Sequence, residues 1–128
     1  MSDPIVIVSA ARTAMGSFQG GFSGLTAANL GAEAIKAAVV RAGLDANLIE
    51  EVLMGCVLQA GQGQAPARQA GIKSGLPKSS EATTVNKMCG SGMQAAVMGR
   101  NAILAGEATV VVAGGMESMT NAPHLVDL

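Results

Sequence analysis

The residues with the clearest capacity for chemistry surround one cysteine, Cys89, in the run Asn86-Lys87-Met88-Cys89-Gly90-Ser91-Gly92. A short strand-like segment precedes this run, and apolar residues at helical spacing follow it. A cysteine at such a strand-to-helix junction lies near unpaired backbone N–H groups and the positive end of the helix dipole, which both favour a nucleophilic thiolate. The same N–H groups could stabilise negative charge on a substrate carbonyl oxygen. The arrangement is the cysteine counterpart of a nucleophile elbow, although G-x-S-x-G itself is absent.

Two glycines beside this cysteine fit the same interpretation. Gly90 and Gly92 permit a sharp turn and let a substrate approach the backbone closely. The alternative interpretation is that Cys89 is one more small buried residue, as most unpaired cysteines are. From chemistry alone, both interpretations of Cys89 stay open.

The other reactive side chains make weaker candidates. Cys56 lies in the strand-like run 52–58, where a small buried residue is expected. His124, the single histidine, could act as a base for Cys89, but a lone histidine beside a proline in a tail is expected to be solvated. Lys87 could favour the Cys89 thiolate, although a solvated or interface lysine is the simpler expectation. Two cysteines are too few for a disulfide framework or a structural zinc site, so we expect reduced thiols.

Metal and dinucleotide sites are not expected either. The eight methionines are interpreted as filling gaps in the core, because Met88, Met93 and Met98 share no ligand-like arrangement with histidines. The segment Gly61-Gln62-Gly63 lacks the third glycine and the acidic residue of a dinucleotide site. We therefore expect neither a metal nor a bound cofactor.

Composition narrows the class of protein. Hydrophobic residues make up 49% of the 128 residues and charged residues 13%, which argues against disorder. A net charge of −1, with basic residues placed singly, predicts no nucleic-acid partner and no anionic membrane partner. Aliphatic runs are far shorter than the ~20 residues of a membrane span, and residues 1–4 show no secretory signal. We expect a cytoplasmic, soluble chain.

Strand-like and helical patterns alternate along the chain, with a glycine-rich loop over 13–25. Strands are predicted at 5–8, 51–58, 82–85 and 109–113, and helices at 27–42, 67–74 and about 93–105. Thr26 and Gly43 suit the start and end of the first helix, and Pro66 suits the start of the second. The order predicts an α/β fold with a mostly parallel sheet covered by helices. Only residues 116–128 follow the last strand, so we expect the layered domain to be cut.

Four blocks of the chain resemble the thiolase family, the acetyl-CoA acetyltransferases and 3-ketoacyl-CoA thiolases. Residues 86–95 resemble the nucleophile segment of that family, and residues 8–14 its first strand and turn. Residues 61–70 resemble the start of its second helix, and residues 113–119 the segment that closes its fourth strand. The blocks follow the family order and cover nearly the whole chain.

The resemblance implies a fold, a reaction and partners. The fold is a layered α/β/α half-domain with four of the expected five strands, and 1–128 would be the N-terminal thiolase domain, truncated before the loop domain and without the C-terminal domain. The reaction is ping-pong acyl transfer, in which Cys89 carries the acyl group during acetoacetyl-CoA formation or thiolytic cleavage of 3-ketoacyl-CoA. Acyl-CoA and coenzyme A are substrates, no cofactor is needed, and the assembly is a homodimer or homotetramer in fatty acid metabolism.

Three motifs that complete the catalytic site in the family are missing from this sequence: Gly-His-Pro, Cys-x-Gly-Gly-Gly and Asn-Glu-Ala-Phe. The resemblance therefore supports only Cys89 and its backbone N–H as an oxyanion donor. We expect the segment alone to be inactive and the remainder of the thiolase chain to be its partner. Glu117 and Arg68 lie in family-like blocks, with structural roles expected for both.

Three other functions remain in view. A decarboxylating or aldol-type condensing relative would keep the fold and the cysteine but change the reaction, although residues 86–95 and 114–119 favour a thiolase. A non-catalytic interaction module gains weight only from the missing motifs. A redox thiol protein is the weakest, since no resolving cysteine stands near Cys89 in the sequence.

Overall fold

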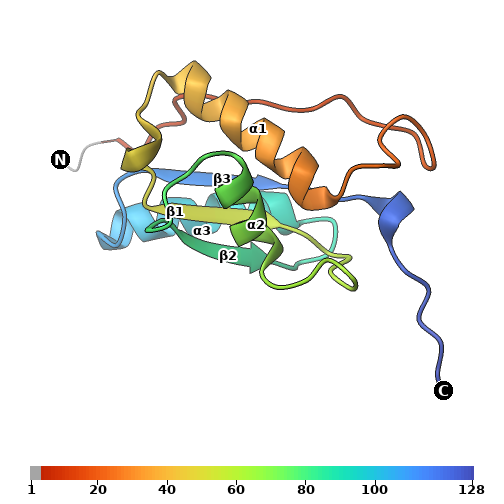
Figure 1. Ribbon diagram of the computed structural model, residues 1–128. Helices are drawn as coiled ribbons and strands as arrows, with labels where there is room; N and C mark the ends of the chain where they lie inside the picture. Colours follow the sequence, from red (N-terminus) through yellow and green to blue (C-terminus); the bar gives the residue numbers. More distant parts are fainter. Residues whose placement is uncertain (1–3) are drawn as a thin grey trace.

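Three parallel strands form the centre of the structure, a computed structural model that describes residues 4–128. They are β1 (Glu51–Gly55), β2 (Glu81–Val85) and β3 (Val111–Gly115), in the order β2-β1-β3 (Figure 1). Gly55 pairs in register with Val85 on one side and Gly115 on the other. All three strands therefore end at one edge of the sheet, where the segments that follow them meet.

Helices connect the strands and cover the sheet on both faces. They are α1 (Ala27–Ala42), α2 (Pro66–Lys73) and α3 (Ser91–Ala105), with short 3-10 helices η1 (Ala46–Leu48) and η2 (Met119–Asn121). The Thr26 hydroxyl accepts the Asn29 N–H at 3.1 Å, and Gly43 ends α1 with a left-handed φ of 66°. Pro66 occupies the first turn of α2, where its missing N–H costs no hydrogen bond. The predicted ends of α1 and the predicted start of α2 are thus confirmed.

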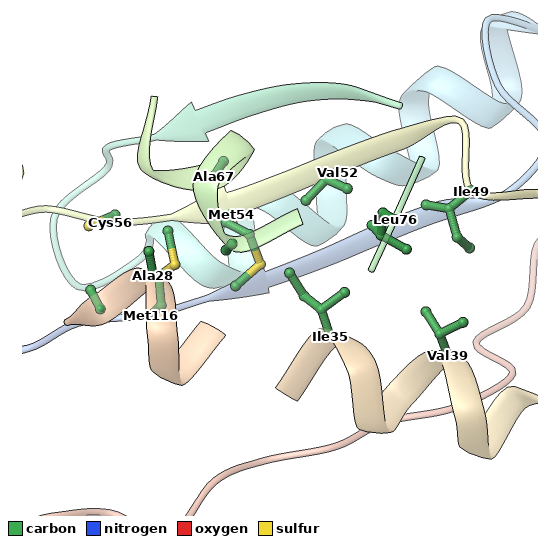
Figure 2. Packing of buried hydrophobic residues seen from close by; sticks show 12 residues of the cluster. Ala28, Ile35, Val39, Ile49, Val52, Met54, Cys56, Ala67, Leu76 and Met116 are labelled. Carbon is green, nitrogen blue, oxygen red and sulfur yellow. The ribbon is translucent and has the colours of Figure 1, made fainter. Parts of the chain in front are cut away.

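The alternation of side chains along β1 divides the core between the two faces. Val52 and Met54 belong to one apolar cluster with Ile35 and Val39 of α1 (Figure 2). Leu53, between them, joins a second cluster with Ala95 of α3. Because successive residues of a strand point to opposite faces, β1 is buried between α1 and α2 on one side and α3 on the other. The α/β class and the layered arrangement are confirmed.

The predicted strand at 5–8 is wrong. This segment has no ladder partner among the described residues, and Val6, Ile7 and Val8 are 65%, 90% and 65% exposed. A strand forms only where a neighbour takes its backbone hydrogen bonds, and β-branched residues alone do not supply one. The sheet therefore has three strands rather than four. Figure 1 shows the N-terminal segment as an extended trace outside the sheet.

Two further strand boundaries differ from the prediction. β1 stops at Gly55 rather than residue 58. The Cys56 N–H still bonds the Val85 carbonyl of β2, but the N–H groups of Val57 and Leu58 bond a side chain instead of a strand, as described below. β3 spans Val111–Gly115 rather than 109–113, so it includes two glycines that the sequence indicated as a boundary. The tail after η2 extends away from the layers (Figure 1).

The outer face of α3 is apolar and open to solvent. Met93, Val97 and Leu104 are 74%, 43% and 55% exposed, at a spacing that places them on one side of the helix. Met88 is also exposed, so the expectation that Met88 and Met93 fill the core is wrong, whereas Met98 packs against the α3-side cluster. Within residues 4–128, no helix combines the length and apolar character that crossing a membrane requires.

Candidate functional site

A cavity of about 840 Å³ opens at the edge where the three strands end. Its walls come from the segments that follow β1, β2 and β3, from α1, and from the loop 11–16. Cys89 lines this cavity and is exposed, so the structure places the predicted nucleophile where a ligand can reach it. Ligands of parallel α/β sheets bind outside the carboxyl ends of the strands, which is where this cavity lies.

The turn that carries Cys89 is held by closely spaced hydrogen bonds. The Asn86 carboxamide accepts the Met88 N–H at 3.1 Å, and the Lys87 carbonyl accepts the Gly90 N–H at 3.0 Å. Met88 has a φ of 48°, in the left-handed region that non-glycine residues seldom occupy. Cys89 follows directly, two residues before α3 begins. The thiol is therefore presented by a defined turn at the positive end of a helix, as predicted.

Glycines let this helix start sit directly on the sheet. A Cβ atom on Gly55 would lie 2.7 Å from the Gly92 nitrogen and from the Cβ of Ser91. A Cβ on Gly115 would lie 3.4 Å from the Gly92 Cα. The backbones of β1, α3 and β3 consequently approach one another with no side chain between them. This contact fixes the height of the Cys89 turn above the sheet.

The second cysteine lies at the same edge in a different environment. Cys56 directly follows β1 and is 1% exposed. The Glu117 carboxylate accepts the N–H groups of Val57 and Leu58 at 2.8 and 3.1 Å, and lies 3.7 Å from the Cys56 sulfur. Burial first, and the charge of Glu117 second, raise the pKa of the Cys56 thiol to about 11. Cys56 is a protonated structural thiol at neutral pH, in agreement with the expectation from sequence.

The remaining candidates lie outside the cavity lining. His124 is exposed in the C-terminal tail, and Lys87 is exposed with its ammonium 3.2 Å from the Gln94 side-chain oxygen. The Arg68 guanidinium donates to the carbonyls of Ser80 and Lys78 at 2.7 and 2.9 Å, so its work is structural. Across residues 4–128, no group of three His, Cys, Asp or Glu side chains has an arrangement that could hold a metal ion.

Sequence reasoning missed two contributions to this site, those of the loop 11–16 and of Ser91, and for Glu117 it expected a structural role without identifying the partners. The loop 11–16 lines the cavity, Glu117 joins the ends of β1 and β3, and the Ser91 hydroxyl bonds within the Cys89 turn. Glu117 contacts residues about 60 positions away, which no local pattern signals. A signal for Ser91 was present, since a serine at the start of a helix commonly bonds nearby backbone.

Comparisons with known proteins agree with this geometry. The family model described as "Thiolase, N-terminal domain" matches residues 5–128. The chain is 55% identical to an acetyl-CoA acetyltransferase of Rhizobium meliloti, covering 100% of this chain and 33% of that protein. It is 56% identical to an acetyl-CoA acetyltransferase of Cupriavidus necator, covering 95% of this chain and 31% of that protein.

A solved structure shares the fold. The Acat5 thiolase from Ascaris suum, crystallised in complex with coenzyme A, superimposes with a TM-score of 0.93 at 47% identity, over 94% of this chain and 32% of that one. The chain thus spans about a third of the length of the relatives it matches. Fold, motif order and sequence identity agree over nearly all of its residues, and this chain belongs to the thiolase family.

Proposed function

We propose that this chain is the nucleophile-bearing part of an acyltransferase that moves acetyl or longer acyl groups between coenzyme A thioesters. One observation carries the proposal: Cys89 is exposed at the start of α3 and lines the 840 Å³ cavity, within a chain of the thiolase family. The relatives named acetyl-CoA acetyltransferases and the coenzyme A complex of the Ascaris suum thiolase support this choice of substrate.

The proposed reaction runs through an acyl-cysteine. The Cys89 sulfur attacks the thioester carbonyl carbon, a new C–S bond forms, and coenzyme A leaves as its thiolate and takes up a proton. In condensation, an acetyl-CoA carbanion then removes the acyl group from the sulfur. In thiolysis, the sulfur attacks the 3-keto carbon of the 3-ketoacyl-CoA instead, the C2–C3 bond breaks so that acetyl-CoA leaves as a carbanion and takes up a proton, and coenzyme A then removes the acyl group from the sulfur. Cys89 lies at the start of α3, and its backbone N–H belongs to the same turn. The helix dipole and this N–H would both stabilise the negative charge that develops on the carbonyl oxygen in both steps.

We further propose that this chain works as part of a longer thiolase polypeptide and is inactive by itself. The relatives are about three times as long, and the chain holds no Gly-His-Pro, Cys-x-Gly-Gly-Gly or Asn-Glu-Ala-Phe motif for the proton transfers. The exposed apolar side chains of α3, and of residues 6–8, support a larger assembly that covers them. The 128-residue chain expressed alone should show neither a cooperative melt nor thiolysis of acetoacetyl-CoA. A cooperative melt or measurable thiolysis by this chain alone would contradict this part of the proposal.

The complete protein is proposed to be a homodimer or homotetramer. β2 pairs with β1 on one side only, so its outer edge is open among the described residues. An open edge is a hazard for aggregation, and symmetric pairing with a second copy removes it. Sedimentation at micromolar concentration should show a dimer or tetramer, and a monomer alone would contradict the proposal.

The test of the reaction uses the full-length protein that contains this chain. Cys89→Ala should lower thiolysis of acetoacetyl-CoA by about a thousandfold or more, because it removes the covalent step. Cys56→Ala is the matched control and should keep activity within about tenfold, since it deletes one sulfur that lies in the cavity wall but is only 1% exposed. Mass spectrometry after mixing with acetyl-CoA should find acetyl on the Cys89 peptide. Turnover by Cys89→Ala at the wild-type rate would end the nucleophile hypothesis.

A further inference from the structure

The Cys89 turn contains a buried hydroxyl that the proposed reaction does not use. Ser91, the first residue of α3, is 5% exposed. Its Oγ accepts the Lys87 N–H at 2.9 Å and donates to the Met88 carbonyl at 2.6 Å. The Ser91 backbone N–H also donates to the Met88 carbonyl, at 3.1 Å. One residue thus bonds the backbone on both sides of the Met88 φ torsion.

These bonds differ from ordinary helix capping. The N-cap of α3 is Gly90, and no side chain caps the helix there. The Ser91 hydroxyl is directed back into the turn, where it bonds residues 87 and 88. Met88 lies between those two bonds, in a left-handed conformation that a non-glycine residue adopts only when its surroundings hold it there. The hydroxyl is therefore placed to hold that conformation.

We propose that Ser91 is a positioning residue for Cys89. Cys89 is bonded covalently to Met88, so the backbone torsions of Met88 set the direction in which the thiol enters the cavity. Ser91 holds these torsions through its hydroxyl and thereby keeps the sulfur in its attacking direction. The role in catalysis rests on the function proposed above, whereas the ordering of the turn does not.

The structure provides a matched control for this role. Ser80 and Ser91 are the two buried polar side chains of the described residues, 4% and 5% exposed. Ser80 Oγ also donates to a backbone carbonyl at 2.6 Å, that of Ile49. Both residues precede their strands, at the end of the sheet opposite the cavity. Loss of the Ser80 hydroxyl removes one hydrogen bond, and loss of the Ser91 hydroxyl removes two. Only the loss at Ser91 should change the geometry of Cys89.

Kinetics of the full-length protein are the first measurement. Ser91→Ala should lower kcat for acetoacetyl-CoA thiolysis about ten- to a hundredfold, with KM within about threefold, because misdirection of a nucleophile by about 1 Å can cost a hundredfold in rate. Ser80→Ala should leave both constants within about twofold of the wild type. Equal effects of the two substitutions would overturn the catalytic part of the inference.

A spin label attached to Cys89 in a Cys56→Ala background gives a readout that is independent of acyl transfer. Ser91→Ala should make the label more mobile in its paramagnetic resonance spectrum, whereas Ser80→Ala should not. Ser91→Thr and Ser91→Val have the same shape and crowd Gly55 equally, so they decide the matter if Ser91→Ala does not fold. Thr should retain the ordered spectrum and Val should lose it. The positioning role would be refuted if Ser91→Ala and Ser80→Ala gave identical spectra and Ser91→Thr and Ser91→Val did so as well, even if acyl transfer itself is demonstrated.

Discussion

Cys56 and Cys89 lie at the same edge of the sheet and line the same cavity, yet the structure prepares them for opposite roles. Cys56 directly follows β1, is 1% exposed, and has a carboxylate beside its sulfur. Cys89 stands four positions after the end of β2, is exposed, and precedes the positive end of α3. The thiol of Cys56 is thus kept protonated and covered at the end of β1, whereas the thiol of Cys89 is accessible to a ligand after the end of β2.

The difference arises in the path of the chain after each strand. After β1 the Cys56 N–H bonds the Val85 carbonyl of β2, and the next two N–H groups bond Glu117, which lies in the segment after β3. After β2 the backbone turns outward through Met88 and reaches Cys89 before the helix begins. A reactive side chain can therefore lie at the carboxyl end of a parallel strand in either environment. The path of the next three or four residues decides whether that side chain is buried or accessible to a ligand.

The largest expected effect is the selectivity of alkylation. At pH 8, a thiol with a pKa of about 11 is ionised in roughly one molecule in a thousand, and burial of Cys56 slows its reaction further. Limited iodoacetamide treatment of the full-length protein should label Cys89 with at least hundredfold preference over Cys56, as measured by peptide mass mapping. The preference for Cys89 should disappear in denaturant. Preferential labelling of Cys56 in the folded protein would contradict the assignment of Cys89 as the accessible thiol.

Removal of the carboxylate that covers Cys56 should come next in size. Glu117→Ala leaves the N–H groups of Val57 and Leu58 without their acceptor, which should lower the free energy of unfolding by about 2–3 kcal/mol in urea titrations. It also removes a charge that raises the Cys56 pKa, so labelling of Cys56 should become faster. Glu33→Ala, on the exposed face of α1, is the control, and an equal loss of stability in both variants would show that the two N–H bonds contribute little.

The smallest of the three effects is the alkaline limit of stability. The Cys56 pKa is 9.0 unperturbed and about 11 in the folded protein. The unfolded state therefore loses this proton first, so the stability due to Cys56 is complete below pH 9 and falls as pH rises toward 11. By about pH 10.5 the wild type should have lost about 1–2 kcal/mol more than Cys56→Ala. Parallel stability curves from pH 8 upward would contradict the raised pKa.

Local signals in the sequence predicted the parts of the fold that depend on local chemistry. Thr26 and Gly43 bound α1 because a hydroxyl acceptor and a left-handed glycine satisfy the ends of a helix wherever they occur. The Cys89 turn was predicted for the same reason, since a strand, a glycine-bearing turn and a helix follow one another in the sequence. The nucleophilic role of Cys89 itself stays a prediction.

Non-local contacts account for what the sequence did not predict. Residues 5–8 have the composition of a strand, but no neighbour takes their hydrogen bonds among the described residues. β3 includes Gly114 and Gly115 because they pair with Met54 and Gly55 of β1. Glu117 ends β1 through bonds across about 60 residues. Each of these features depends on a partner that a local pattern does not identify.

The contact of Gly55, Gly92 and Gly115 has an entropic consequence for the Cys89 turn. A helix that packs through side chains is positioned by rotamers, which can change and let the helix shift. Here the helix start touches the sheet through backbone atoms, which have no rotamers to exchange. The glycine backbones lose their conformational entropy when the chain folds. Few alternative conformations then remain that could shift the start of α3 relative to the sheet. The rigid part of the site is thus made from the residues that are the most flexible before folding.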